Sequence, residues 1–390
     1  MFYSQLALPL SSVLVSLIMN NIEKLYNEWL LMQPLKQELK RQMDQQFMID
    51  FNYNSNHLEG NTLTYGQTKL LLLFGDTIGN ASMQDYEEMK AHNVGLELMK
   101  ITALDKERPL SESFIRELNK TILVRDFWKT SRDGTFRYLI KVGRYKTRPN
   151  SVITPTGELF DYASPEETPA LMTDLVNWYN KEERKCILSP IELSVLFHYR
   201  YIRIHPFEDG NGRIARLLVN FILLRHNYPM IVVRTDDRSN YLKMLHQCDL
   251  LTGKIPSDGA NASIEQIKPL IGYIEDIVEK KLTAVIQLIN GEIKELVETN
   301  DDNVSENDTE KPIYDTEKPI NDTEKLSVRE REILEMIKQT NTVSRKIIAE
   351  KLGIGTATVA RNIELLKLKG IIERVGGDRG GYWKIINKTF

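Results

Sequence analysis

The sequence predicts a mainly α protein with one short β-hairpin in its core and a smaller α+β module towards its C-terminal end. Three observations support this fold class. Apolar residues recur at every third or fourth position through most of residues 20–298, which is the period of a buried helical face. A polar repeat with prolines follows at 299–325, and a compact basic segment occupies 326–390. A chain of 390 residues is long enough for two or three domains.

Composition and cysteine content limit the class of protein. The chain has 42% hydrophobic and 27% charged residues, the balance of a soluble globular protein. Cys186 and Cys248 lie 62 positions apart and form no Cys-x-x-Cys pair. Neither a disulfide framework nor a zinc site is therefore indicated, and a reducing, cytoplasmic location fits.

The first 19 residues form an uncharged, apolar extension. Its apolar part, from Leu6 to Ile18, is interrupted by Pro9 and is shorter than the ~20 residues that span a membrane. It has no basic segment before it and no small-residue cleavage site after it. We therefore predict neither a membrane span nor a targeting signal in residues 1–19. Our hypothesis is that Met19 is the native start, because an amphipathic helix opens directly after it.

Helices are expected throughout residues 20–110, an N-terminal region, and residues 111–298, the core. Apolar residues three or four positions apart predict them at 25–47, 67–74, 86–104, 169–179 and 264–297. The exception is the segment 142–153, which glycine and Pro-Asn bound as they would a short β-hairpin.

Two further core helices enclose a loop of unusual composition. Ser189 and Glu192 form a capping box around Pro190, which predicts the start of the first helix. The second is predicted from residue 213 to 224, where apolar residues again have helical spacing. The loop with the start of the second helix reads His205-Pro206-Phe207-Glu208-Asp209-Gly210-Asn211-Gly212-Arg213, followed one turn later by Arg216.

This loop predicts a site for phosphate chemistry. Gly210 and Gly212 permit positive φ, so the backbone amides around Asn211 are expected to form a concavity that attracts phosphate oxygens. The free N–H groups and dipole of the following helix add to that attraction. Arg213 and Arg216 lie three positions apart on that helix and can point to the same side, where guanidinium groups suit phosphate.

Asp209 and His205 supply the remaining chemistry of the loop. A carboxylate beside bound phosphates is what Mg²⁺ requires, and a histidine with a pKa near ~6.5 is largely neutral and can act as a general base. Phe207 is expected to anchor the loop in the core. The alternative is a metal hydrolase, which is disfavoured because no two histidines have the helical spacing of a zinc site. Its ligands would be His198, His205, Glu208 and Asp209.

Residues 205–216 follow the pattern His-Pro-Phe-x-Asp-Gly-Asn-Gly-Arg-x-x-Arg, which resembles the signature of the Fic family without departure. The resemblance implies a Fic-type helical bundle that transfers AMP from ATP to a Ser, Thr or Tyr hydroxyl of a target protein. It implies that His205 deprotonates the hydroxyl and that Asp209 holds Mg²⁺. It also implies a homodimer paired through the core. The motif residues that would bind the nucleotide phosphates are Gly210, Asn211, Gly212, Arg213 and Arg216.

The segment Ser55-Asn56-His57-Leu58-Glu59-Gly60 resembles the inhibitory motif of the same family, Ser/Thr-x-x-x-Glu-Gly/Asn. The resemblance implies that Glu59 pairs with Arg216 and blocks the productive position of the γ-phosphate, because one anion then sits where another must bind. The alternative interpretation, from the residues alone, is a helix end stopped by Gly60, with Glu59 in solvent.

Two more segments resemble parts of Fic proteins. Residues 142–153 resemble the flap, which holds the target by adding its modifiable segment as an extra strand. Residues 238–242 resemble the segment beside the nucleotide base, with Asn240 and Tyr241 as the contacts. Tyr241 fits an ordinary core aromatic equally well.

Residues 299–325 repeat Asp-Thr-Glu-Lys with a period of seven. This polar, proline-containing repeat cannot bury a core, so we predict a flexible linker rather than a coiled coil. Residues 326–390 then follow the order helix, helix, turn, helix, hairpin and resemble a winged helix. Its elements are predicted at 327–339, 344–352, 356–369, 371–375 and 381–386.

The winged-helix segment is basic on an acidic protein. Residues 326–390 contain 13 Lys and Arg against 7 Asp and Glu, a net charge of +6, whereas the rest of the chain has a net charge of −9. This asymmetry predicts DNA binding; docking to another protein is the alternative. The residues expected to face a major groove are Thr356, Thr358, Arg361 and Asn362.

The sequence as a whole favours an autoinhibited protein adenylyltransferase that depends on Mg²⁺ and ATP. One rival is a DNA-associated regulator whose Fic core only senses nucleotide. Another is an enzyme that removes AMP, for which Glu59 would position water. Transfer is favoured because the motif is intact, with His205, Asp209, Arg213 and Arg216 all present. A site that had lost its activity would not need to keep the base.

Overall fold

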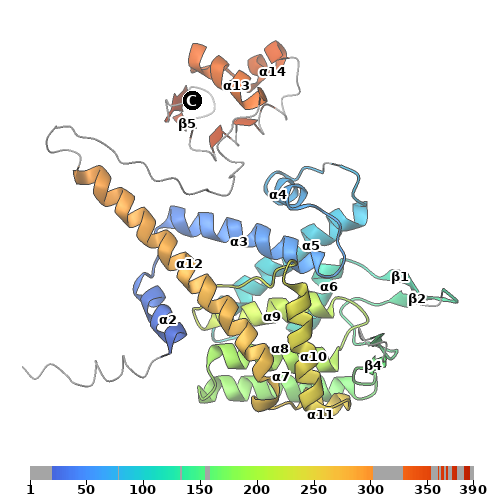
Figure 1. Ribbon diagram of the computed structural model, residues 1–390. Coiled ribbons are helices and arrows are strands. Elements are labelled where there is room, and N and C mark those ends of the chain that lie inside the picture. The colour runs from blue at the N-terminus through green and yellow to red at the C-terminus, as the bar shows by residue number, and fades with distance from the viewer. Residues whose placement is uncertain are drawn as a thin grey trace, which may run out of the picture. The chain divides into compact units, whose positions relative to one another are not determined.

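The computed structural model divides the chain into two compact units, residues 1–304 and 305–390. The division falls within the segment 299–325, where the sequence predicts a linker (Figure 1). Each unit is described by itself. The structure describes residues 20–77, 79–131, 134–153, 159–301, 328–352, 359, 362–363, 366–367, 371–375 and 382–386.

Within the described residues the first unit starts with four helices, and the first two of them correct one prediction. The single helix expected at 25–47 is two helices, because Pro34 lacks an N–H group and its ring cannot follow a preceding helical turn. The expected extension at 1–19 lies outside the described residues. The four helices are α2 (Asn21–Leu31), α3 (Gln37–His57), α4 (Tyr65–Phe74) and α5 (Met83–Leu104).

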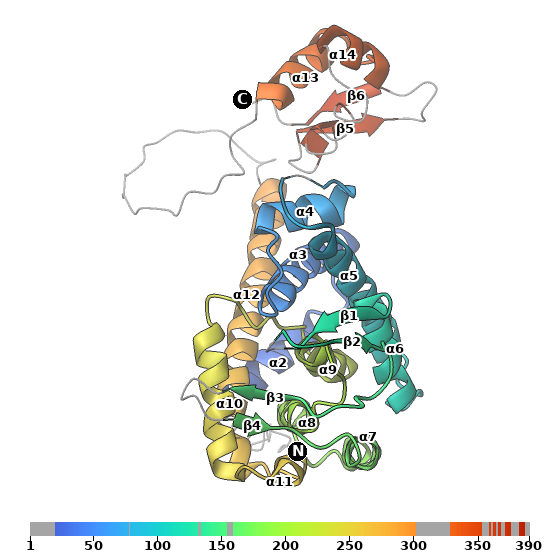
Figure 2. The same cartoon turned by 90° about the vertical axis from the view of Figure 1, so that its right-hand side faces the viewer.

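Seven helices follow, and the predicted phosphate loop lies between the third and the fourth of them, α8 and α9. Ser189 caps α8 in a reciprocal capping box with Glu192, as predicted. Thirteen of the 15 residues of α9 are buried, so this helix forms the centre of the unit (Figure 2). The seven helices are α6 (Glu112–Leu123), α7 (Thr168–Lys185), α8 (Pro190–Ile204), α9 (Asn211–Arg225), α10 (Arg238–Thr252), α11 (Pro256–Ala260) and α12 (Lys268–Asp301).

Two antiparallel hairpins lie between α6 and α7, where the sequence predicted one. The first pairs β1 (Phe127–Thr130) with β2 (Arg137–Ile140), and the second pairs β3 (Ser151–Ile153) with β4 (Leu159–Asp161). The hairpin predicted at 142–153 is wrong, because most of that segment is a loop between the two hairpins. Its backbone amides are used elsewhere: Gly143 donates to the side chain of Asn119, and Lys146 donates to Pro206 O.

The apolar core of this unit has two parts, and α8 and α9 contribute to both. One part contains Phe197 of α8 and Phe221 of α9, packed with residues of α3, α5, α6 and α7. The other contains Tyr199 and Leu223 from the opposite faces of the same helices, packed with α2, α10 and α12. Among the described helices, none has the length and apolar character that a membrane span requires. The phosphate loop is thus held by helices buried on all sides.

The second unit has the order of elements that the sequence predicts. Two helices, α13 (Val328–Gln339) and α14 (Arg345–Leu352), precede an antiparallel hairpin of β5 (Ile372–Val375) and β6 (Tyr382–Ile385). Trp383 is buried at the centre of its core and donates its indole N–H to Val343 O. The predicted third helix lies mostly outside the described residues.

Arg203 ties the end of α8 to the segment that links α10 and α11. Its guanidinium is fully buried and donates to Tyr199 Oη at 3.0 Å and Thr252 Oγ1 at 2.8 Å. It also donates to the backbone oxygens of Gly253 and Ile255, each at 2.9 Å. The phosphate loop begins two residues later, so this network fixes the helix end that carries it.

Replacing Arg203 with methionine should therefore destabilise the protein by about 3 kcal/mol, because buried carbonyls and hydroxyls lose their partner. Urea unfolding followed by circular dichroism measures this. Arg234→Met is the matched control, since Arg234 pairs with Asp236 in an exposed position and its loss should change stability little. Equal effects of the two substitutions would contradict the structural role of Arg203.

Buried His198 predicts a loss of stability in acid. Burial, with a smaller contribution from Arg216, lowers the pKa of His198 to about 3. Below pH ~6.5 the histidine therefore binds a proton in the unfolded chain but not in the folded protein. The free energy of unfolding then decreases by about 1.4 kcal/mol for each pH unit of acidification because of this group. Urea midpoints from pH 7 to pH 4 should fall less steeply in His198→Phe than in the intact protein. Parallel curves would show that His198 titrates normally.

Candidate active site

The loop between α8 and α9 is shaped by its own side chains. Helix α8 ends at His205, which has a left-handed φ of 50°, and α9 starts after Gly210, with a φ of 82°. Asn211 closes the loop on itself: its Nδ2 donates to Phe207 O at 2.7 Å and its Oδ1 accepts from Phe207 N at 3.0 Å. Phe207 is 1% exposed and anchors the loop in the core, as predicted.

Both glycines of the motif are needed for close approaches. A Cβ at Gly210 would lie 3.3 Å from Asn119 Nδ2 and from Ile122 Cδ1, in addition to the strain of positive φ. A Cβ at Gly212 would collide with the carboxylate of Glu59. The Glu59 carboxylate therefore rests against the first turn of α9, where free amides and the helix dipole attract an anion.

Glu59 reaches this position from the end of α3 and pairs with Arg216. Its Oε1 lies 2.8 Å from Arg216 Nη2. The same guanidinium donates from Nε to Ser55 Oγ at 3.0 Å and from Nη2 to Ser55 O at 2.8 Å. Burial raises the pKa of Glu59, but Arg216 and Arg213 lower it by more, so the carboxyl stays ionised. Gly60, with a φ of 99°, turns the chain directly afterwards.

Arg213 faces two carboxylates. Its Nη1 lies 3.5 Å from Glu88 Oε2 of α5, and its Nη2 lies 3.4 Å from Asp209 Oδ1. The side chain is only 5% exposed, and its Nε has no hydrogen-bond partner among the described residues. A buried guanidinium with long ion pairs and a spare donor is suited to take a phosphate oxygen.

Asp209 is the carboxylate at the rim of the site. Its Oδ1 accepts from Gly210 N at 2.7 Å, and its Oδ2 lies 2.8 Å from Lys129 Nζ on β1. Burial raises the pKa of Asp209, but Lys129 and Arg213 lower it by more. No group of three or more metal-ligating residues is present among the described residues. One ionised rim carboxylate fits Mg²⁺, which takes one or two protein ligands when it binds with nucleotide phosphates.

His205 is held by contacts that the sequence did not predict. Its ring stacks on Tyr162, with the centroids 4.0 Å apart and the planes 11° from parallel. Its Nδ1 is buried without a hydrogen-bond partner in the described part of the chain. Burial lowers the pKa of His205 to about 3, and the nearby Lys146 acts in the same direction. The imidazole is therefore neutral at physiological pH, so one of its ring nitrogens carries no proton.

Lys146 and Asn150 fix the loop from outside. Lys146 is buried and donates from Nζ to Ile204 O at 3.0 Å and to Asn150 Oδ1 at 2.7 Å. Asn150 in turn donates from Nδ2 to His205 O at 3.3 Å and to Phe207 O at 3.0 Å. Burial lowers the pKa of Lys146 to about 7. These two residues lie in the segment 142–153, but a hairpin pattern gives no signal for contacts with a loop more than 50 positions away.

Other predicted site residues lie in different surroundings. Asn240 is exposed, whereas Tyr241 is 5% exposed in the core, with its hydroxyl 2.9 Å from His198 Nε2. Tyr241 thus has the position of the core aromatic that the sequence allowed. The Nε2 of His198 is thus engaged with Tyr241. The hydrolase alternative required His198 to share a metal with His205 and Glu208, but the described residues contain no such group of ligands.

The predicted DNA-facing residues need one correction. Asn362 is 6% exposed and lies among core residues of the second unit, so it does not face outward. The helical period places it beside Ile363 on the buried side of the third helix. Three others, Thr356, Thr358 and Arg361, lie outside the described residues.

Comparisons with known protein sequences match both units. Residues 109–223 match the Fic/DOC family, and residues 329–382 match an HTH domain. The protein adenylyltransferase fic-1 of Caenorhabditis elegans is 30% identical over 268 residues, which are 68% of this chain and 45% of that protein. The protein adenylyltransferase Fic of Nematostella vectensis is 26% identical over 253 residues, 65% and 51% of the two chains. The chain spans about half the length of the curated relatives it matches.

Solved structures show the same fold. A Fic domain containing signaling protein from Bacteroides thetaiotaomicron is 63% identical and superposes with a TM-score of 0.66, over 70% of this chain and 97% of that one. A fragment of Fic-1 from C. elegans is 27% identical with a TM-score of 0.53, over 73% of each chain. With its intact motif loop and a relative matched over nearly its whole length, the chain belongs to the Fic/DOC family.

Proposed function

We propose that this protein is an adenylyltransferase that moves AMP from ATP to a Ser, Thr or Tyr hydroxyl of a target protein, and that Glu59 inhibits it. The observation that carries the proposal is the carboxylate of Glu59, seated in the first turn of α9 and paired with Arg216 at 2.8 Å. A site that holds one anion in this way is suited to hold the phosphates of a nucleotide. Several matched relatives are named protein adenylyltransferase.

In the proposed reaction His205 takes the proton of the target hydroxyl. The hydroxyl oxygen then attacks the α-phosphorus of ATP, the bond from that phosphorus to the bridging oxygen breaks, and pyrophosphate leaves. Its charge would be met by Arg213 and Arg216 and by the amides of Gly210 to Gly212. Asp209 would hold Mg²⁺, which supplies positive charge to the phosphates. For this the ammonium of Lys129 must move away from Asp209 Oδ2.

Inhibition follows from the geometry of Arg216. The side chain is 5% exposed, and its Nε and Nη2 already bind Ser55 and Glu59, so neither nitrogen is available to a γ-phosphate oxygen. The negative charge of Glu59 at the same point repels the phosphate as well. ATP must therefore bind in a displaced position while Glu59 stays in place.

The neutral imidazole of His205 favours transfer over the rival in which the core only senses nucleotide. We call the amides of Gly210 to Gly212, with Arg213 and Arg216, the anion cradle. A protein that only senses nucleotide needs this cradle but no base, whereas His205 is stacked on Tyr162 and kept unprotonated. The removal of AMP from a modified target is the other rival, and Glu59 is close enough to the cradle to position water for it. Release of AMP from a modified protein tests that rival directly.

Glu59→Gly should raise AMP transfer by about ten- to a hundredfold, because it frees a charge-assisted hydrogen bond of Arg216 for the γ-phosphate. The measurement is the incorporation of α-labelled ATP into protein, in the full chain with Mg²⁺. Glu107→Gly is the matched control, since Glu107 is an exposed loop residue remote from the motif in sequence. His205→Ala, added to Glu59→Gly, should abolish incorporation but leave nucleotide bound. Absence of label in every variant would remove the transferase proposal.

The second unit is proposed to bind DNA, on the strength of the HTH match and of the net charge of +6 that residues 326–390 have. A chain ending at residue 325 should then lose retention of double-stranded DNA on a filter while keeping self-modification in the Glu59→Gly background. The retention of the full chain should fall steeply with salt. Equal retention by both chains would show that the module docks to protein instead. The homodimer and the cytoplasmic location stay predictions.

A further inference from the structure

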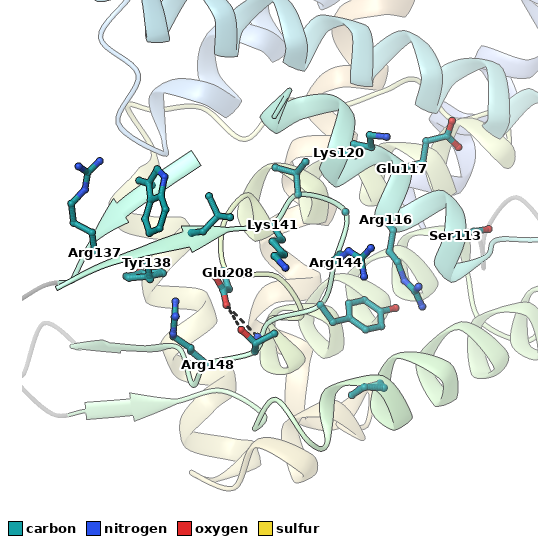
Figure 3. A pocket seen from close by; sticks show the side chains of 17 residues that line it. Ser113, Arg116, Glu117, Lys120, Arg137, Tyr138, Lys141, Arg144, Arg148 and Glu208 are labelled. Carbon is teal, nitrogen blue, oxygen red and sulfur yellow. Dashed lines mark hydrogen bonds between the residues drawn. The ribbon is translucent and has the colours of Figure 1, made fainter. Parts of the chain in front are cut away.

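A cleft of about 1170 Å³ opens beside the motif loop, on the side of α6, the β1–β2 hairpin and the loop after β2. Six basic side chains line it against two acidic ones, Glu117 and Glu208. In Figure 3 Lys141, Arg144 and Glu208 lie around its middle, with Arg137 and Arg148 towards one end and Arg116 towards the other. The six cations are Arg116, Lys120, Arg137, Lys141, Arg144 and Arg148.

This concentration of positive charge is not explained by the fold. The chain as a whole has a net charge of −3, and residues 1–325 have −9. Lys120, Lys141 and Arg144 are exposed and make no ion pair within the described part of the chain. Unpaired cations gathered in one concavity focus a positive potential and attract an acidic partner.

The cleft is fixed to the motif loop. Glu208, next to the rim carboxylate, accepts from Thr147 N at 3.2 Å and from Thr147 Oγ1 at 3.0 Å. Lys146 N donates to Pro206 O at 2.8 Å, and Gly143 N donates to Asn119 Oδ1 at 2.8 Å. A ligand in the cleft therefore lies at a set position beside Glu208, three residues after His205 in the motif loop.

The aromatic rings of the cleft argue for a peptide rather than a nucleic acid. Arg116 covers one face of Tyr145 at 4.6 Å, Arg148 covers one face of Tyr138 at 4.6 Å, and Arg137 lies 6.0 Å from the ring of Trp128. Single-stranded nucleic acids are held by bases stacked on open aromatic faces. In this cleft arginine guanidinium groups cover the aromatic faces on which bases would stack. Guanidinium groups bind carboxylates well, so an acidic peptide fits the cleft better.

We propose that this basic cleft binds an acidic segment of the target protein and so selects which hydroxyl reaches His205. The proposal rests on the proposed transfer reaction for its purpose, but the binding itself does not require transfer. Lys120, Lys141 and Arg144 would attract the carboxylates, and the arginines stacked on the rings would form the sides of the groove.

The test is the binding of a fluorescent peptide of Glu and Asp residues around a single Thr, measured by anisotropy with the full chain. A matched peptide of Gln and Asn residues should bind at least about tenfold more weakly, and added salt should reduce this difference. The variant K120E/K141E/R144E should lose about tenfold or more in affinity for the acidic peptide. The control K24E/K69E/K280E reverses three exposed lysines that do not line the cleft, with the same change in net charge.

The outcomes separate this proposal from the proposed function. Loss of acidic-peptide binding in the cleft variant alone supports the cleft, even if no AMP is transferred to any protein. Equal binding by both triple variants overturns it. If a labelled single-stranded oligonucleotide loses binding in the cleft variant and the acidic peptide does not, the cleft is a nucleic-acid site and the proposal is wrong. Near-native circular dichroism of both variants rules out misfolding as the cause.

Discussion

The site depends on one electrostatic constraint, a buried guanidinium at the start of a buried helix. Arg216 is 5% exposed on α9, so its charge must be matched by an anion or by oxygen acceptors. In this structure the end of α3 provides both, through Glu59 and Ser55. The N-terminal helices are thereby attached to the core helix α9 by the same group that a nucleotide phosphate would need. Folding of the N-terminal region and access to the cradle are thus coupled.

The rest of the loop is arranged around that constraint. Asn211 and the two glycines fix the backbone amides, and Asn150 and Lys146 fix the carbonyls on the other side. Arg213 and Arg216 lie beside Glu59, and Lys129 and Arg213 lie beside Asp209, which is why burial does not protonate either carboxylate. Burial, together with the nearby Lys146, lowers the pKa of His205 and keeps its ring neutral. The anion site and the imidazole therefore owe their charge states to different neighbours.

Local patterns predicted much of this, and non-local contacts account for the rest. The capping box at Ser189 and the Gly-Asn-Gly turn act within a few residues, so the sequence places them correctly. The stacking of Tyr162 on His205 joins residues 43 positions apart, and the pairing of Lys129 with Asp209 joins residues 80 positions apart. No periodicity or turn rule reports such pairs. The hairpin predicted at 142–153 failed for the same reason, since the backbone of that loop bonds to α6 and to the motif loop.

In the proposed function the anion site of α9 and the basic cleft have different tasks, and their charges are separate. The first turn of α9 holds the carboxylate of Glu59, so in the proposed function a nucleotide would compete with a carboxylate of the same chain. In the cleft, Lys120, Lys141 and Arg144 make no such ion pair with another described residue. A bound target would not neutralise Arg216, and a bound nucleotide would not fill the cleft. Target binding alone therefore gives no electrostatic reason for Glu59 to leave, and release of the cradle must come from a change in α3 or in the helices that hold it.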